Sequence, residues 1–235
     1  MNLEERLKKI RSKGYWRVVI RPTVFEKHRI ATLSQARELV RSSVVYLRGW
    51  DYPHWGEDEL RNVGEWVESG VDWNSFIEYW RFYRSGQFVH FFAAREDHID
   101  VERQLPISYP PRPKRAGYLS TIGTVFTVTE IFEFAARLAA KDVLRPAAVV
   151  SIQLHNMADH QLATFDASRL LFGDYTCTAT EPIVFENEFS QDELISRTDE
   201  LALDAVVEIF EHFNWDNPPR QTFVEDQRRL RERRL

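Results

Sequence analysis

The chain has 235 residues, of which 43% are hydrophobic and 29% are charged, and its formal net charge is −5. This composition is typical of a folded globular protein and excludes disorder over most of the length. The negative charge disfavours a dedicated non-specific DNA-binding protein, since such proteins are usually basic. The single cysteine, Cys177, excludes an intrachain disulfide and a Cys-rich zinc site.

The first ten residues, MNLEERLKKI, lack the uninterrupted apolar stretch of a signal peptide. No run in the sequence approaches the roughly 20 apolar residues that span a bilayer. We therefore expect a cytoplasmic protein with no membrane partner. Aromatic residues make up 13% of the chain and predict a large core, because each ring buries a large apolar area.

The first seventy residues predict alternating helices and strands. We expect a charged helix at 3–12, a strand at 15–21, a helix at 33–40, and strands at 43–47 and 63–67. Thr32 and Gln35 have the spacing of a capping box, which predicts where the second helix begins. The Gly and Pro residues of 48–56 predict a loop.

Residues 76–94 predict a β-hairpin that turns at Ser85 and Gly86. Pairing outward from this turn places Tyr83 opposite Phe88, and Arg81 opposite His90. Side chains alternate between the two faces of a strand. One face is therefore expected to carry Tyr79, Arg81, Tyr83, Phe88, His90 and Phe92, and the other Trp80, Phe82, Val89 and Phe91.

The second half of the chain predicts two long apolar helices, at 122–141 and 190–213, which need a sheet to pack against. Ser190 and Glu193 have the spacing of a second capping box, where the later helix is expected to begin. We expect strands at 149–155, 175–179 and 183–188, and a charged helical tail at 222–235. Strands outnumber helices and follow one another as meanders. The fold class expected is therefore α+β, with a mostly antiparallel sheet covered by the two long helices.

We interpret residues 1–235 as a single domain, with possible halves at 14–100 and 117–217. A polar segment at 96–117 separates these halves and holds four prolines. Proline and polar residues at this density predict a long loop.

The common signatures of catalysis and cofactor binding are missing from the sequence. It has no GxxxxGK[ST], GxGxxG, HExxH or GxSxG motif, and no zinc-deaminase signature. We therefore expect no cofactor and no metal. His155, Asp159 and His160 form the only weak metal candidate, because their spacing matches no tight ligand pattern. Cys177 is interpreted as a buried, inert thiol.

The loop at 48–54 is one candidate functional site. Asp51 is placed to orient His54 as a general base or phosphate ligand, and Arg48 to hold an anion. In the structural alternative, Asp51 caps a turn and pairs with Arg48, while Trp50 and Tyr52 anchor the loop. The sequence leaves both interpretations open.

Two other sites are candidates for nucleic-acid contact. Rings and a cation on an open sheet face, as predicted for the hairpin at 76–94, form a stacking platform for bases. The alternative is that a helix buries this face. The tail holds Arg228, Arg229, Arg231, Arg233 and Arg234, which suit phosphate contacts. Glu225, Asp226 and Glu232 lie among them, so the alternative for the tail is a solvated helix.

The segments RGWDYPH at 48–54 and EYWRFYRSGQF at 78–88 resemble an uncharacterised bacterial family. IFEFAARL at 131–138 and the strand that ends at His155 and Asn156 extend this resemblance, which covers about 14–227. The family's region stands alone or adjoins a Schlafen-type AlbA-like domain, which is associated with nucleic acids. Its function is unknown, so the resemblance implies no catalytic residue.

Three functional hypotheses follow. The first is a non-enzymatic bacterial binding or regulatory module that senses nucleic acid or a nucleotide, with ligand contacts from Arg48, Tyr79, Arg81, Tyr83, Phe88 and His90. The second is a small metal-independent hydrolase or nuclease that uses Asp51, His54 and His90. The third is a structural or oligomerisation domain, whose partner is another protein or a second copy of the chain.

Overall fold

The computed structural model describes residues 3–101, 105, 114–166, 169, 171 and 173–234. Within them, seven strands form one sheet in the order β2-β3-β4-β5-β1-β7-β9, and every neighbouring pair is antiparallel. This confirms the α+β class with a mostly antiparallel sheet. The strands are β1 Tyr15–Pro22, β2 Arg61–Val63, β3 Trp66–Trp73, β4 Phe76–Tyr83, β5 Phe88–Ala93, β7 Ala147–His155 and β9 Ile183–Ser190.

Two short strands form a separate parallel pair, β6 Gly117–Ser120 and β8 His160–Ala163. The helices are α1 Leu3–Arg11, α2 Leu33–Arg41, α3 Thr121–Ala139, α4 Gln191–Ser196, α5 Thr198–Glu211 and α6 Arg220–Arg231. Two 3-10 helices follow loops, η1 Glu57–Glu59 and η2 Arg95–His98. None of the described helices combines the length and the apolar character that crossing a bilayer requires.

Strand β1 lies near the centre of the large sheet and joins the two predicted halves. It pairs with β5 on one side and with β7 on the other, so segments 14–100 and 117–217 build the same sheet. Its alternate residues Val18 and Ile20 have no exposed area and contribute to the main core. The prolines of the predicted loop, at positions 106–113, lie outside the described residues.

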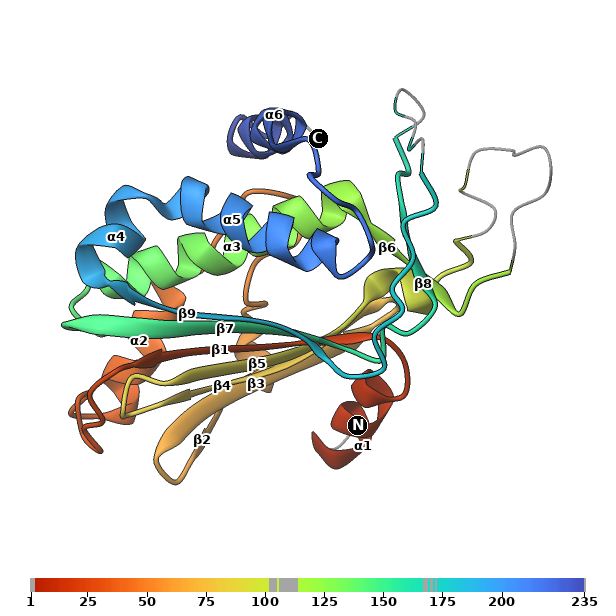
Figure 1. Cartoon of the computed structure of the whole chain (residues 1–235). Coiled ribbons are helices and arrows are strands. Elements are labelled where there is room, and N and C mark those ends of the chain that lie inside the picture. The colour runs from red at the N-terminus through yellow and green to blue at the C-terminus, as the bar shows by residue number, and fades with distance from the viewer. Residues whose placement is uncertain are drawn as a thin grey trace.

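The helices α3, α4 and α5 lie on one face of the sheet, and α6 forms a further layer above them (Figure 1). In α3, Val128, Ile131 and Phe132 are fully buried, as its nearly continuous apolar surface predicts. The second predicted helix is divided at Arg197, which separates α4 from α5. The capping boxes at Thr32 and at Ser190 both form.

The opposite face of the sheet is packed at one end by α1 (Figure 1). Ile10 of α1 forms a small cluster there with Ile77, Tyr79 and Ala93. Other side chains of this face, such as Arg17, Arg81 and Phe91, are half-exposed. An antiparallel sheet commonly has one covered face and one that meets water in this way.

Two of the predicted strands are wrong. Residues 43–47 and 175–179 make only isolated bridges, Val45 to Tyr52 and Thr176 to Gln161. Val45 exchanges both of its backbone hydrogen bonds with Tyr52 of the following loop. Among the described residues, this single bridge is the only β-pairing of 43–47. The strand predicted at 63–67 covers the end of β2, the turn at 64–65 and the start of a much longer β3.

The predicted register of the hairpin is also wrong, by one residue. The backbone N–H of Tyr83 donates to the carbonyl of Gln87 at 2.8 Å, and Phe82 lies opposite Phe88. The loop therefore has three residues, 84–86, where a two-residue turn was expected. Because side chains alternate, this shift moves every residue of β5 to the other face relative to β4.

The corrected register divides the predicted ring platform between two faces. Phe88, His90 and Phe92 lie on the face that α3 covers, beside Trp80 and Phe82 of β4. Tyr79, Arg81 and Tyr83 remain on the opposite face, beside Val89 and Phe91. The six residues therefore do not form a single binding surface.

Gly86 lies in this loop with a positive φ, which provides a test of the loop's backbone conformation. Its φ is +86°, and an added Cβ would lie 3.1 Å from Pro22 Cγ and 3.2 Å from the carbonyl oxygen of Val143. We expect Gly86→Ala to lower the free energy of unfolding by about 1–2 kcal/mol, because L-residues avoid positive φ. Ser85→Ala in the same loop should change it by less than about 0.5 kcal/mol. Urea unfolding of both variants measures these free energies. Equal losses of stability in the two variants would contradict the assigned loop.

Candidate functional site

A cavity of about 820 Å³ lies between the first half of α3, the loop at 48–55 and the strands β4 and β5. Its size is in the range of small-molecule sites. Its ring-bearing wall includes Trp16, Trp50, Trp73, Phe76, Phe92 and Phe126. Its charged lining comprises the carboxyl groups of Asp51, Glu78, Glu96, Glu130 and Asp166 and the arginines Arg48, Arg95 and Arg229.

Glu78 lies at the centre of the polar lining and is almost fully buried. His90 Nε2 donates to Glu78 Oε2 at 2.7 Å, and Trp50 Nε1 donates to Oε1 at 2.8 Å. The backbone N–H of His54 donates to Oε2 at 3.3 Å. Burial raises the pKa of Glu78, but these donors outweigh it and hold the pKa below its ordinary value. Glu78 is therefore a buried, ionised carboxylate.

Glu130 of α3 is fully buried and faces Arg48 of the loop. Arg48 Nε donates to Glu130 Oε1 at 3.1 Å, and Arg48 Nη2 lies 2.6 Å from Oε2. Nη2 also donates to Thr127 Oγ1 at 3.0 Å. Burial raises the pKa of Glu130 to about 7; Arg48 opposes this rise, and the charges of Glu78 and Asp51 add to it.

Asp51 and His54 form a second pair at the edge of the cavity. His54 Nδ1 lies 2.6 Å from Asp51 Oδ1, and the N–H of Trp55 donates to Oδ2 at 2.8 Å. The hydrogen bond to Asp51 raises the pKa of His54. Burial raises the pKa of Asp51, but the bonds from His54 and Trp55 prevail and lower it. Asp51 thus both caps the turn and orients His54, as the two interpretations separately predicted.

Parallel rings form one wall of the cavity. The ring of Trp50 stacks on His54 at 4.4 Å and on Phe76 at 4.3 Å, and Trp73 lies 5.7 Å away. The guanidinium carbon of Arg95 lies 4.7 Å above the Phe76 ring. Trp73 is 57% exposed, so the wall reaches the surface of the protein.

Three polar atoms of the cavity's side chains have neither a hydrogen-bond partner nor an ion-pair partner among the described residues. They are the Tyr52 hydroxyl, Thr124 Oγ1 and His90 Nδ1, and each side chain is at least nine-tenths buried. Burial and the charges of Glu78 and Glu130 raise the pKa of Tyr52 well above its ordinary value, so its hydroxyl stays protonated. Buried polar groups normally have partners, so atoms like these mark places where a ligand or water completes the structure.

The structure brings some of the predicted site residues together and separates others. Arg48, Asp51 and His90 line the cavity, and His54 adjoins it through Asp51 and Trp50. Phe88 is fully buried in the core. On the opposite face, Arg81 Nε donates to Glu68 at 3.1 Å and its guanidinium lies over Trp66, while Tyr79 hydrogen-bonds the same Glu68.

The sequence analysis missed the two buried carboxylates. Glu78 begins the segment EYWRFYRSGQF, and Glu130 is the one charged residue between Thr121 and Phe132 of α3. An ionisable residue on a helix face that must be buried was the available signal, since such groups are rarely buried without a partner. In the structural alternative for the loop, Arg48 pairs with Asp51; in the structure it pairs with Glu130.

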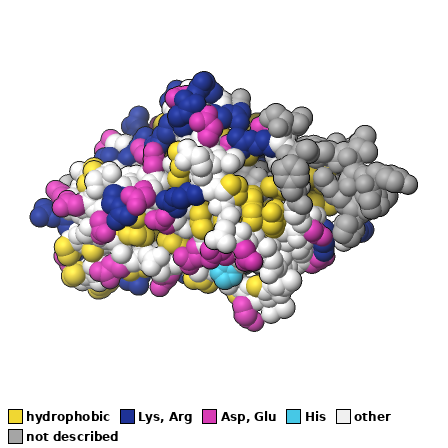
Figure 2. Space-filling model, turned by 45° about the horizontal axis from the view of Figure 1, so that its top comes forward, with side chains coloured by type: hydrophobic (Ala, Val, Ile, Leu, Met, Phe, Trp, Pro, Cys, Tyr) yellow, Lys and Arg dark blue, Asp and Glu magenta, His cyan; other side chains and the backbone are white. Residues whose placement is uncertain are grey.

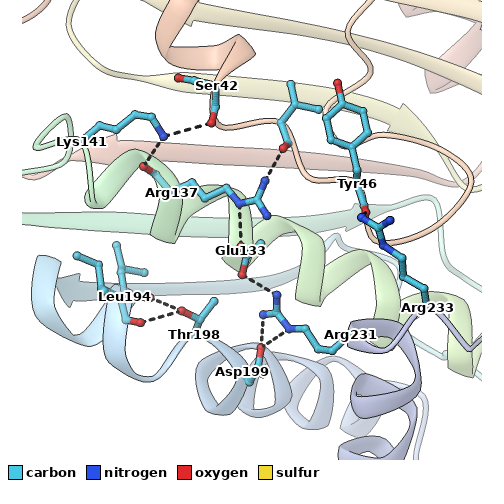
Figure 3. Close-up of polar contacts among 12 residues, drawn as sticks. Ser42, Tyr46, Glu133, Arg137, Lys141, Leu194, Thr198, Asp199, Arg231 and Arg233 are labelled. Atoms are coloured by element: carbon cyan, nitrogen blue, oxygen red, sulfur yellow. Dashed lines mark hydrogen bonds and ion pairs between the residues drawn. The ribbon is translucent and has the colours of Figure 1, made fainter.

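The predicted tail is a packed helix. Phe223 and Leu230 of α6 are buried, and Gln227 Nε2 donates to Thr129 Oγ1 of α3 at 3.1 Å. Arg231 donates to Glu133 at 2.7 Å and also binds Asp199, and Arg233 donates to the carbonyl of Tyr46 at 2.9 Å (Figure 3). These contacts join α6 to α3, α5 and the loop before Arg48.

The remaining tail arginines are paired as well. Arg228 lies 2.6 Å from Glu225, Arg229 lies 3.5 Å from Asp166, and Arg234 binds Glu232. In Figure 2, the Lys and Arg side chains at the top of the molecule accordingly lie beside Asp and Glu side chains. All five predicted tail arginines therefore engage groups of the protein itself.

The weak metal candidate is distributed over three separate contacts. The His155 ring stacks on Tyr15 at 4.5 Å, Asp159 lies 3.0 Å from Arg115, and His160 Nε2 lies 3.0 Å from Asp97. Within the described ranges, no three His, Cys, Asp or Glu side chains form a group that could hold a metal ion. Cys177 is buried, and burial raises the pKa of its thiol.

No protein-family model, curated protein or solved structure matches this chain. The resemblance of the two motifs to an uncharacterised bacterial family therefore stays a prediction. Inference about function rests on the geometry of the cavity.

The raised pKa of Glu130 predicts a specific pH dependence of stability. The pKa of Glu130 is near 4.5 in the unfolded chain and about 7 in the folded chain. Between these two pH values the folded chain binds one more proton than the unfolded chain. Stability from this group is therefore fully present at low pH and is lost as the pH rises through 7. We expect the unfolding free energy of Glu130→Gln, relative to the native chain, to increase by about 2 kcal/mol from pH 5 to pH 8.

Glu133→Gln, one turn further along α3, is the matched control for this test. Hydrogen bonds from Arg231 and Arg137 outweigh burial and lower the pKa of Glu133, so its contribution should stay constant over the same interval. Urea titrations of the three proteins at four pH values measure the difference. If the difference in unfolding free energy between Glu130→Gln and the native chain does not change with pH, Arg48 keeps Glu130 ionised throughout.

Proposed function

We propose that the protein is a non-enzymatic binding module whose ligand is a small planar molecule, of the size and shape of a nucleobase or nucleoside, held in the 820 Å³ cavity. The observation that carries this proposal is the combination of a stacked ring wall with buried polar atoms that lack partners. Most small-molecule sites combine apolar walls with a few fixed polar groups in this way.

The polar lining supports binding because it is held rigidly before any ligand enters. Glu78 is fixed by three donors, and Arg48 is fixed by Glu130 and Thr127. A site that is already ordered loses little conformational entropy when it binds a ligand. The Tyr52 hydroxyl and Thr124 Oγ1 then supply hydrogen bonds that no described residue of the protein uses.

The hydrolase hypothesis has less support from the same geometry. The imidazole rings of His54 and His90 bind different carboxylates, Asp51 and Glu78, and do not hydrogen-bond one another. In the part of the chain that the structure describes, neither imidazole hydrogen-bonds a hydroxyl or thiol of the kind that a nucleophilic mechanism needs.

Binding of a nucleic-acid strand also has less support than binding of a small ligand. A strand requires a run of cations toward its phosphates. The tail arginines are paired with carboxylates or carbonyls, and Glu68 neutralises Arg81 on the open sheet face. Carboxyl groups outnumber arginines around the cavity, which disfavours a polyphosphate and favours a base or nucleoside.

Calorimetric titration with nucleobases, nucleosides and simple heteroaromatic compounds tests the proposal. Trp73→Ala removes an exposed end of the ring wall and should weaken binding roughly 5-fold to 100-fold, since one stacking contact contributes about 1–3 kcal/mol. Tyr52→Phe removes a hydroxyl that has no partner in the part of the chain that the structure describes, so it should weaken binding without lowering stability.

Trp66→Ala is the control, because Trp66 lies half-exposed on the opposite face of the sheet. It should leave affinity unchanged. The proposal is wrong if no planar compound binds at millimolar concentration, or if Trp66→Ala and Trp73→Ala weaken binding equally.

A further inference from the structure

The ring wall of the cavity ends in a planar cation that the protein itself supplies. The rings of His54, Trp50 and Phe76 are stacked within 20° of parallel, and the Arg95 guanidinium lies over the outer face of Phe76 at 4.7 Å. Arg95 is exposed, and its Nε donates to Ser75 Oγ at 3.3 Å. A guanidinium favours the face of a ring both electrostatically and by shape, so this end of the wall suits a flat cation.

The charges around the wall are predominantly negative. Five carboxyl groups and three arginines line the cavity, and two of those arginines are already neutralised: Arg48 by Glu130 and Arg229 by Asp166. Glu96 lies directly beside Arg95 on η2 and accepts a hydrogen bond from the N–H of Ser120. A cation that enters the cavity therefore meets an excess of carboxyl groups.

Burial is the main cause of the raised pKa of two of these carboxyl groups, and nearby carboxylates add to it. Burial raises the pKa of Glu96, and the neighbouring charge of Asp97 adds to the rise. Burial likewise raises the pKa of Glu130, with contributions from Glu78 and Asp51. Both groups lie where a further positive charge would be stabilising.

The hydrogen-bonding groups without partners are suited to a donor-rich ligand. His90 Nε2 donates to the ionised Glu78, and among the described residues its Nδ1 has no partner. The hydroxyl oxygens of Tyr52 and Thr124 can accept hydrogen bonds. A guanidinium or amidinium group has several N–H donors and no acceptor, which complements this set.

We infer that the cavity recognises a planar cation, a guanidinium or amidinium group, which takes the place of Arg95 on the outer face of Phe76, at the end of the ring wall, and pairs with Glu96 and Glu78. This inference rests on the proposed function and narrows its ligand class. The group can belong to a free small molecule or to an arginine side chain of a peptide, since the chemistry of recognition is the same.

Isothermal titration of the full chain with benzamidine and with benzamide tests the inference, because the two compounds have nearly the same shape and differ in charge. We expect benzamidine to bind at least tenfold more tightly. Equal affinities would overturn the inference while leaving the proposed planar-ligand site intact. Failure of both compounds to bind, together with binding of neutral nucleosides, would also overturn it. If no planar compound binds at all, the proposed function fails with it.

Peptides distinguish the two sources of the cation. Gly-Arg-Gly is compared with the same peptide carrying citrulline, whose side chain is planar and neutral. If Gly-Arg-Gly binds more tightly than benzamidine and the citrulline peptide does not bind, the cation is an arginine side chain. If benzamidine binds and Gly-Arg-Gly does not, it is a free small molecule. Tighter binding of the citrulline peptide would overturn the inference.

Two substitutions locate the cation in the cavity. Glu96→Gln keeps an acceptor for the N–H of Ser120 and should weaken benzamidine binding at least fivefold. The control is Glu186→Gln, at an exposed position of β9, which should leave benzamidine binding unchanged. Arg95→Ala removes the protein's own cation from Phe76 and should strengthen benzamidine binding severalfold. Weaker binding to Arg95→Ala, or no effect of Glu96→Gln, would overturn the inference.

Discussion

The buried carboxylate of Glu78 determines how the loop at 48–55 lies against the sheet. Burying an isolated charge costs several kcal/mol, so such a group is stable only when donors surround it. Here the donors come from β5, through His90, and from the loop, through Trp50 and the backbone of His54. The loop is thereby fixed to the sheet. The Trp80 indole adds a further bond, to the carbonyl of His54 at 2.9 Å.

A second buried carboxylate, Glu130, fixes the loop from the side of α3. Its partner Arg48 belongs to the same loop that satisfies Glu78, so one segment neutralises charges from both walls of the cavity. Helix α6 stabilises this segment from outside, because Arg233 binds the carbonyl of Tyr46 and Arg231 binds Glu133 on α3 (Figure 3). The arginine-rich tail thus acts as a structural clamp on the elements that carry the cavity.

Local sequence patterns predicted the elements with strong periodicity and clear ends. The apolar surface of α3 and the capping boxes at Thr32 and Ser190 depend on neighbours within a few residues, and they were predicted correctly. The strand predicted at 43–47 failed because Val45 pairs only with Tyr52. Likewise, β6 and β8 have four residues each and pair across a distance in sequence that no local pattern records.

The candidate site was harder to predict because its residues meet only through tertiary packing. The proximity of Asp51 and His54 could be predicted, since they are three residues apart in one turn. The partnership of Glu78 with His90 could not, because it depends on the register of the hairpin. A two-residue turn and a three-residue loop are both compatible with the residues around Gly86, and they place His90 on opposite faces of the sheet.

The register of this hairpin consequently decides which of its side chains line the cavity. In the expected register, rings and Arg81 share an open face, which suits an extended strand of nucleic acid. In the observed register, His90 and Phe92 turn inward beside Glu78, and Tyr52 of the 48–54 loop packs against both rings. The carboxyl groups of this cavity would repel the phosphates of a nucleic-acid strand, which is why we propose a single flat ligand instead. One extra loop residue thus moves His90 and Phe92 from the predicted ring platform to the acidic cavity on which that proposal rests.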